Sequence, residues 1–172
     1  EISECLVGSE MCIRDRDETV PPDYTPAQTV ETLARRKGEA VLPLRPEKPI
    51  IAADSVVSID GLILGKPKDD EAAKDTLRRL SGRTHEIFTG VCLLANGKRD
   101  VFHRSTQVKF YPLAEEEIAE YVAMGESRGR AGAYGIEGIG VVLVESICGD
   151  YSNIVGLPVA ETIRRLHRLL AR

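Results

Sequence analysis

The sequence lacks three features that would each indicate a particular class of protein. It has no apolar run near the ~20 residues of a membrane span, so we expect no contact with a membrane. It has no basic excess, with 23 Lys and Arg against 27 Asp and Glu, which argues against a general nucleic-acid-binding protein. Its four cysteines show neither zinc-knuckle nor C-x-x-C spacing. We therefore expect a reduced, cytoplasmic protein in which Cys92 and Cys148 are buried as small apolar residues.

The composition is that of a globular protein, with 42% hydrophobic and 29% charged residues. Residues 1–16 differ from the rest, because they hold two of the four cysteines and show no hydrophobic period. They are no signal peptide, since no basic region precedes an apolar stretch. We interpret residues 1–16 as a segment foreign to the domain, with a disordered tail as the alternative, and we expect residues 17–172 to form one domain.

Strand and helix patterns alternate after residue 16. Thr25-Pro26 pairs an N-cap with a proline, which predicts a helix start, and Asn96-Gly97 predicts a hairpin turn. Helices are predicted at residues 27–42, 69–80, 114–124 and 159–170, and strands at 50–59, 85–94, 98–111 and 141–147. A glycine-rich loop is predicted at 125–140 and a turn at 148–153. Helices combined with an antiparallel hairpin favour an α/β fold with a mixed sheet flanked by helices.

Asp54 interrupts the apolar start of the strand at 50–59. A buried carboxylate is costly unless it is paired or binds a metal, so Asp54 is a candidate for chemistry; a surface or capping aspartate at a strand end is the alternative. Lys66 follows in the sequence Leu-Gly-Lys-Pro, between a permissive glycine and a rigid proline. A lysine there can hold a phosphate as a point charge, although an ordinary surface turn has the same sequence.

Three further candidates come from the helix, the glycine-rich loop and the N-terminal part. Lys37 ends the basic run Arg35-Arg36-Lys37. Three successive helix residues cannot all face one way, so at least one of these side chains points toward the protein. A solvated basic helix end is the alternative. Residues 131–140, AGAYGIEGIG, offer backbone N–H groups and close approach to a flat ligand, with a structural turn as the alternative. Within this stretch, Glu137 can accept hydrogen bonds from a base edge. Glu18 can add a carboxylate to a metal site.

The order of these motifs resembles the Maf family of nucleoside triphosphate pyrophosphatases, most of all its dTTP/UTP branch. The matching stretches are DE, LARRKGEAV, AADSVV, DGLILGKP, LSGRTHEIFTGV, EEIAEYVAMGE, AGAYGIEG and GDYSNIVGLP. The resemblance implies a curved sheet with two lobes around a cleft, and often a homodimer. It also implies hydrolysis of a nucleoside triphosphate to the monophosphate and pyrophosphate with a divalent metal cation, Mg²⁺ or Mn²⁺.

The resemblance also implies roles for single residues, with Asp54 as the proton acceptor. The resemblance makes Lys37 and Lys66 the phosphate-facing lysines. It makes Glu18, together with Asp54, a carboxylate near the metal, and Ser55 and Glu137 the residues that influence nucleotide choice. The chemistry agrees with these roles. Attack of water on the α-phosphorus needs a base, and the leaving pyrophosphate needs positive charge beside its oxygens.

Two departures from the family pattern bear on activity and on substrate. The family's N-terminal S-x-S-P-R-R loop is not found in this sequence, so we expect this chain to be impaired. Ser55 and Glu137 stand where the dTTP/UTP branch usually has Thr and Gln, and a glutamate favours a base that donates hydrogen bonds or carries positive charge. The nearest alternative is therefore a 7-methyl-GTP pyrophosphatase. An alternative of another class is a non-catalytic nucleotide-binding protein linked to septum formation.

Overall fold

The computed structural model describes residues 19–171, which contain a five-stranded sheet in the order β2-β1-β3-β4-β5. Neighbouring strands in this part of the chain are all antiparallel. The strands are β1 (Ile50–Ile59), β2 (Leu62–Leu64), β3 (Thr84–Ala95), β4 (Lys98–Phe110) and β5 (Val144–Cys148). The main helices are α2 (Pro26–Val41), α3 (Asp70–Leu80), α4 (Glu115–Ala123), α5 (Tyr151–Val155) and α6 (Val159–Leu170). The predicted α/β class with a sheet flanked by helices is confirmed, but the described strands are all antiparallel, whereas a mixed sheet was predicted. The predictions for residues 1–16 and Glu18 lie outside the described residues.

Helix α2 begins where the sequence predicts. Thr25 Oγ1 accepts a hydrogen bond from the Gln28 backbone N–H at 3.3 Å, and Gln28 Oε1 accepts one from the Thr25 N–H at 2.9 Å, which forms a capping box. The helix lies on β1 and β3 and buries Val30 and Ala34. Its backbone comes so close to β3 that a Cβ at Gly90 would lie 2.3 Å from the Val30 carbonyl oxygen. A glycine in the strand therefore sets how near the helix lies to the sheet.

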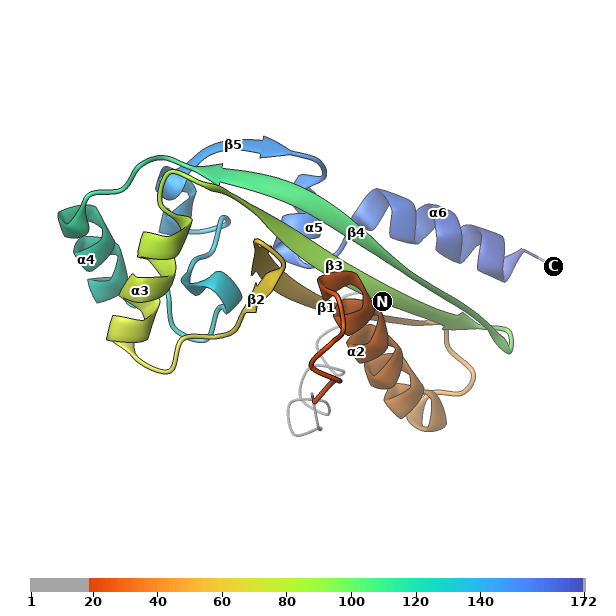
Figure 1. The fold of residues 1–172 in the computed structure, drawn as a ribbon. Helices are drawn as coiled ribbons and strands as arrows, with labels where there is room; N and C mark the ends of the chain where they lie inside the picture. The colour runs from red at the N-terminus through yellow and green to blue at the C-terminus, as the bar shows by residue number, and fades with distance from the viewer. Residues whose placement is uncertain (1–18, 172) are drawn as a thin grey trace.

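Strands β3 and β4 form the hairpin that the Asn96-Gly97 pair predicts. The hairpin runs along most of the molecule in Figure 1 and pairs Ala95 with Lys98 at its turn. Asn96 and Gly97 have φ angles of 52° and 70°, the positive values that a two-residue type I′ turn requires. The hairpin joins the end of the molecule that bears α3 and α4 to the end that bears α2 and α6.

Buried apolar side chains gather in three clusters along this hairpin. Two lie on opposite faces of β1 and β3: Ala52 and Cys92 pack under α2, and Val91 and Leu93 pack with residues of α6. The third lies at the other end of the hairpin, where α3 and α4 pack on the sheet. It includes Leu77, Leu80, Phe110, Ile118 and Val122. The sheet therefore connects two separately packed regions.

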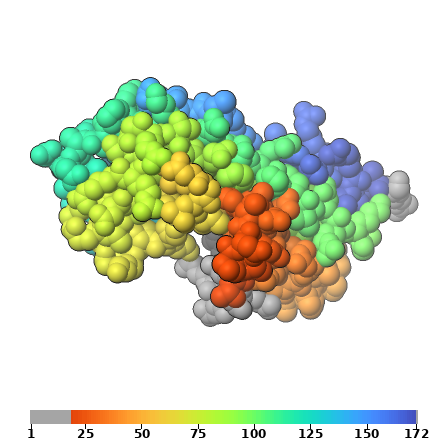
Figure 2. All heavy atoms as spheres, viewed as in Figure 1, coloured from red at the N-terminus to blue at the C-terminus, as the bar shows by residue number. Residues whose placement is uncertain are grey.

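The segment around β2 lies between these regions. On the face shown in Figure 2, the first part of α2 (red) lies next to the β2 segment (yellow), as it also does in Figure 1. The helix that carries Lys37 and the segment that leads to Lys66 therefore share one face of the molecule. Within residues 19–171, the helices are too short or too polar to cross a membrane.

Two local secondary-structure predictions are wrong. The last strand starts at Val144 rather than at residue 141, because Ile139–Leu143 forms a 3₁₀ helix, η3. The stretch at 148–153 is more than a turn, because its second half begins helix α5. Asp150 caps this helix by accepting a backbone N–H at 2.8 Å, which is a strong helix-start signal in a sequence otherwise typical of turns.

The two cysteines in the body of the protein differ from each other. Cys92 is buried as predicted, but Cys148 is exposed, so its predicted burial is wrong. Cys148 ends β5, which lies at the edge of the described sheet next to β4. An edge strand has a neighbour on one side, which leaves its end open to solvent.

Candidate active site

Asp54 and Lys37 form an ion pair between the sheet and helix α2. Asp54 lies in the middle of β1, and its side chain is 13% exposed, whereas that of Lys37 is 24% exposed. A carboxylate this buried needs a partner, and the Lys37 ammonium supplies it. Asp54 is therefore not a strand-end cap, and Lys37 is the member of the basic run that faces the protein.

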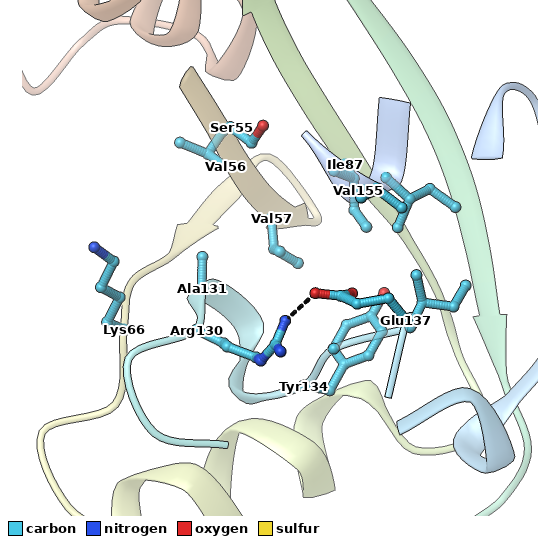
Figure 3. Close-up of a pocket in the computed structure, with 13 residues that line it drawn as sticks. Ser55, Val56, Val57, Lys66, Ile87, Arg130, Ala131, Tyr134, Glu137 and Val155 are labelled. Carbon is cyan, nitrogen blue, oxygen red and sulfur yellow. Dashed lines mark hydrogen bonds and ion pairs between the residues drawn. The ribbon is translucent and has the colours of Figure 1, made fainter. Parts of the chain in front are cut away.

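A cavity of about 240 Å³ begins one residue further along β1. Residues from β1, β3, α5, the segment after β2 and the glycine-rich loop line it, and most of them are labelled in Figure 3. The cavity brings together three of the predicted site residues, Ser55, Lys66 and Glu137. Asp54 and Lys37 are not among its lining residues, but Asp54 directly precedes Ser55 in β1, and Lys37 of α2 contacts Asp54.

Strand geometry connects the ion pair to this cavity. Successive side chains of a strand point to opposite faces, so Asp54 and Ser55 point apart and Val56 returns to the face of Asp54. Figure 3 shows Val56 and Lys66 on one side of β1 and the Ser55 hydroxyl on the other. Strand β2 pairs with β1 only from Val57 onward in the described sheet. The cavity is therefore lined from both faces of β1, by Ser55 on one face and Val56 on the other.

Ser55 is held by a chain of polar contacts that reaches α5. The Ser55 and Thr89 hydroxyl oxygens are 2.8 Å apart, and Thr89 donates to the Asn153 carbonyl oxygen at 2.9 Å. Because Thr89 has one hydroxyl proton, Ser55 is the donor to Thr89. The Asn153 amide in turn donates to the Ile87 carbonyl oxygen at 3.0 Å. The Ser55 oxygen is thus oriented so that it can accept, but not donate, a hydrogen bond to a ligand.

Glu137 lines the cavity as an ion pair rather than as an isolated carboxylate. Its Oε1 accepts a hydrogen bond from Nη1 of Arg130, and the dashed line in Figure 3 marks this contact. Partial burial raises the pKa of Glu137, but the Arg130 hydrogen bond, its own backbone N–H and the Arg130 charge together lower the pKa below its usual value. The negative charge that the sequence places here is therefore compensated within the protein.

Tyr134 forms another part of the cavity wall and rests on buried His85. Its hydroxyl oxygen lies 2.8 Å from His85 Nε2. The rings of His85 and Phe110 meet edge to face with centroids 4.9 Å apart. Burial lowers the pKa of His85 to about 4 and raises that of Tyr134. At neutral pH the pair is therefore uncharged, as a group in a hydrophobic core should be.

Glu126 fixes the end of the glycine-rich loop. Its carboxylate accepts the backbone N–H groups of Ile139 at 3.0 Å and Gly140 at 3.2 Å. The hydrogen bond from Ile139 is the main reason why the pKa of Glu126 lies below its usual value. A Cβ at Gly138 would lie 2.4 Å from the same carboxylate. Glycine at 138 therefore lets the loop close on Glu126, and this closure positions Glu137.

The described residues suit a metal that is held largely by its substrate. Residues 19–171 contain no group of three His, Cys, Asp or Glu that could bind a metal ion by themselves. Mg²⁺ commonly uses one or two carboxylates together with substrate phosphates, and Asp54 offers one such carboxylate beside the cavity. Glu18, the other predicted ligand, lies outside the described residues.

Sequence reasoning did not identify Arg130, Tyr134 or the Ser55–Thr89 contact. Arg130 precedes Glu137 by seven residues in a loop, where no helical or strand period predicts which side chains meet. Thr89 lies opposite Ser55 in the β1–β3 register, so the correct strand pairing was the signal that could have found it.

Comparisons with known proteins agree with the resemblance seen in the sequence. The family model described as "Maf-like protein" matches residues 3–169. A dTTP/UTP pyrophosphatase from Bacillus cytotoxicus is 43% identical over 160 residues, which cover 93% of this chain and 84% of the relative. Proteins of the same name from Geobacillus sp. (strain WCH70) and Bacillus velezensis are 45% and 44% identical; these matches cover 89% and 87% of this chain and 82% and 79% of the relatives. The chain belongs to the Maf-like family.

Proposed function

We propose that this protein hydrolyses dTTP and UTP to the nucleoside monophosphate and pyrophosphate. Relatives with this activity in their names are 40–45% identical over most of the chain. One observation carries the proposal to these residues: the Asp54–Lys37 pair directly adjoins a cavity lined by Ser55, Lys66 and Glu137. An acid–base group, two ammonium groups and a base-sized cavity are the parts that the reaction needs.

Asp54 acts as the general base in this mechanism. It accepts a proton from the water that attacks the α-phosphorus, and Lys37 holds its carboxylate in place through the ion pair. Lys66 lies at the edge of the cavity with its side chain extended (Figure 3). In the proposed mechanism its ammonium group contacts phosphate oxygens of the substrate. Its charge stabilises the negative charge that develops as pyrophosphate leaves.

A divalent cation, Mg²⁺ or Mn²⁺, fits this arrangement. Asp54 and Glu18 would hold it together with oxygens of the triphosphate, and it would supply positive charge at the phosphates. Asp54 can serve both roles because a carboxylate has two oxygens and about four lone-pair sites.

Ser55 and Glu137 face the nucleoside part of the substrate. The Ser55 oxygen accepts a hydrogen bond from the ligand because its own proton is directed to Thr89. The Glu137 carboxylate accepts an N–H of the base. These two residues lie on different elements on opposite walls of the cavity (Figure 3), so together they fix the orientation of the nucleoside.

The wider organisation follows the same family expectation. The two separately packed regions of the sheet form two lobes around a cleft, and residues 17–172 form one domain. The separate apolar clusters at the two ends of the hairpin support this division. The protein works in the cytoplasm, where a reducing environment keeps the free thiols of Cys92 and Cys148 reduced, and it forms a homodimer.

Product analysis in isotopically labelled water tests the proposed function. Purified protein is incubated with Mg²⁺ or Mn²⁺ and, separately, UTP, dTTP or 7-methyl-GTP in H₂¹⁸O, with a parallel sample in EDTA. We expect pyrophosphate from UTP and dTTP, with the ¹⁸O in the monophosphate because water attacks the α-phosphorus. Turnover of 7-methyl-GTP alone would assign the protein to the alternative substrate. Nucleotide binding without any product would favour the non-catalytic role.

A further inference from the structure

The glycine-rich loop places a paired donor and acceptor on the cavity wall. Arg130 and Glu137 come from the two sides of Tyr134, and both line the cavity (Figure 3). The Arg130 Nη1 group contacts Glu137 Oε1, and the two side chains are 38% and 44% exposed. The pair is therefore open enough to touch a ligand, and a ligand meets both members together.

The loop backbone is shaped to hold the Arg130 guanidinium. A Cβ at Gly135 would lie 2.4 Å from Arg130 Nη1 and 2.5 Å from Cζ, so the guanidinium lies directly over the backbone of residue 135. The Gly135 N–H is held by the Tyr121 hydroxyl at 3.3 Å. Arg130 is thus positioned by the fold, independently of its contact with Glu137.

We propose that Arg130 is a specificity-determining residue that, through its pairing with Glu137, selects a base with one imide N–H beside a carbonyl, as in uracil and thymine. This inference rests on the proposed function, because it assigns the base to this end of the cavity. Glu137 alone would offer two carboxylate oxygens, which match the two adjacent donors of guanine, its ring N–H and its amino group. The Arg130 guanidinium occupies the Oε1 side of the carboxylate, so Oε2 is the acceptor left for the N–H of a base.

The donors of Arg130 complete the match to a pyrimidine. A guanidinium has five N–H donors, and one of them is used at Glu137. Others can donate to the carbonyl next to the imide N–H of uracil or thymine. Guanine presents the same N–H and carbonyl, but its additional amino group then has no acceptor on Glu137. The pair also has no net charge, so it offers a cationic 7-methylguanine no charge partner. A base whose donor finds no acceptor in the site is rejected because that donor stays unpaired. Such a penalty can change the relative affinities for two bases more than an added favourable contact does.

Binding of unreactive nucleotides tests this inference separately from turnover. Dissociation constants for the α,β-imido analogues of UTP and GTP, and for 7-methyl-GMP, are measured by calorimetry with the full chain. The variants are Arg130→Ala and Gly135→Ala, because an alanine Cβ at 135 displaces the guanidinium without removing it. Arg128→Ala is the matched control, because it removes an arginine two residues away from Arg130. Arg128 pairs with Asp70 at 3.2 Å, and neither residue lines the cavity.

The preference for the UTP analogue over both guanine nucleotides should fall at least tenfold in Arg130→Ala and in Gly135→Ala. It should stay within twofold of the wild type in Arg128→Ala. An unchanged preference in a folded Arg130→Ala or Gly135→Ala protein, or an equal loss in Arg128→Ala, would overturn the inference. A shifted binding preference in a protein that hydrolyses no nucleotide would refute the proposed function and leave this inference standing.

Discussion

The buried His85 should make the protein unstable in mildly acidic solution. Its ring is 1% exposed, packs edge to face on Phe110, and contacts the Tyr134 hydroxyl through Nε2. In the part of the chain that the structure describes, His85 Nδ1 has no hydrogen-bond partner. A protonated imidazole donates from both nitrogens, so protonation would leave a buried charge with an unsatisfied donor.

The size of the effect follows from linkage between proton binding and folding. Burial lowers the pKa of His85 from 6.5 to about 4. Between these values the unfolded chain binds a proton that the folded protein does not, so the free energy of unfolding falls as the pH falls below 6.5 and levels off near pH 4. At about 1.4 kcal/mol for each pH unit, the full loss is about 3 kcal/mol, a large part of a typical domain's stability.

The His85→Gln variant isolates this contribution. Glutamine can keep a polar atom near the Tyr134 hydroxyl but does not titrate. Urea unfolding from pH 7 to pH 4.5 should show a loss of stability in the wild type that exceeds the loss in His85→Gln by about 2–3 kcal/mol. His167→Gln, at an exposed position on α6, controls for the removal of a histidine as such. Parallel pH curves for the wild type and His85→Gln would refute the reasoning.

Two further substitutions test the site and its support. Lys66→Ala should reduce kcat/KM for UTP about 10²–10³-fold if the Lys66 ammonium contacts the phosphates. Lys68→Ala, at an exposed position outside the cavity lining, should leave kcat/KM unchanged. Equal steady-state kinetics for the two variants would place Lys66 in an ordinary turn. Gly90→Ala should lower the free energy of unfolding, measured in urea, by about 1–3 kcal/mol, because the alanine Cβ would collide with the Val30 backbone. A variant as stable as the wild type would contradict the close approach of α2 to β3.

Local signals in the sequence were sufficient for most of the fold. The Thr25 cap, the apolar run of β1 and the Asn96-Gly97 turn each act within a few residues, and the structure has all three where they were predicted. The prediction that failed for Cys148 depends on distant partners. Cys148 is exposed because β5 lies at the edge of the sheet, and the order of strands is a property of the whole sheet.

The candidate site shows the same division between local and distant information. Asp54 was found because a carboxylate in an apolar strand needs a partner, and Lys37 is that partner. The compensation of Glu137 by Arg130 was not found. Their meeting depends on a glycine-rich loop whose φ angles include positive values at Gly132 and Ala133, and no simple period describes such a backbone.

Asp54→Asn gives the most direct test of the central claim that this carboxylate is the base of a nucleoside triphosphate pyrophosphatase. Single-turnover release of pyrophosphate from UTP is compared with that of the wild type and of Asp60→Asn. Asp60 follows the same strand, in an exposed turn with φ 52°, a conformation that asparagine tolerates well. We predict a rate about 10²–10⁴-fold lower for Asp54→Asn, in a protein that is still folded under the assay conditions, and a normal rate for Asp60→Asn. A near-normal rate for Asp54→Asn would contradict the account.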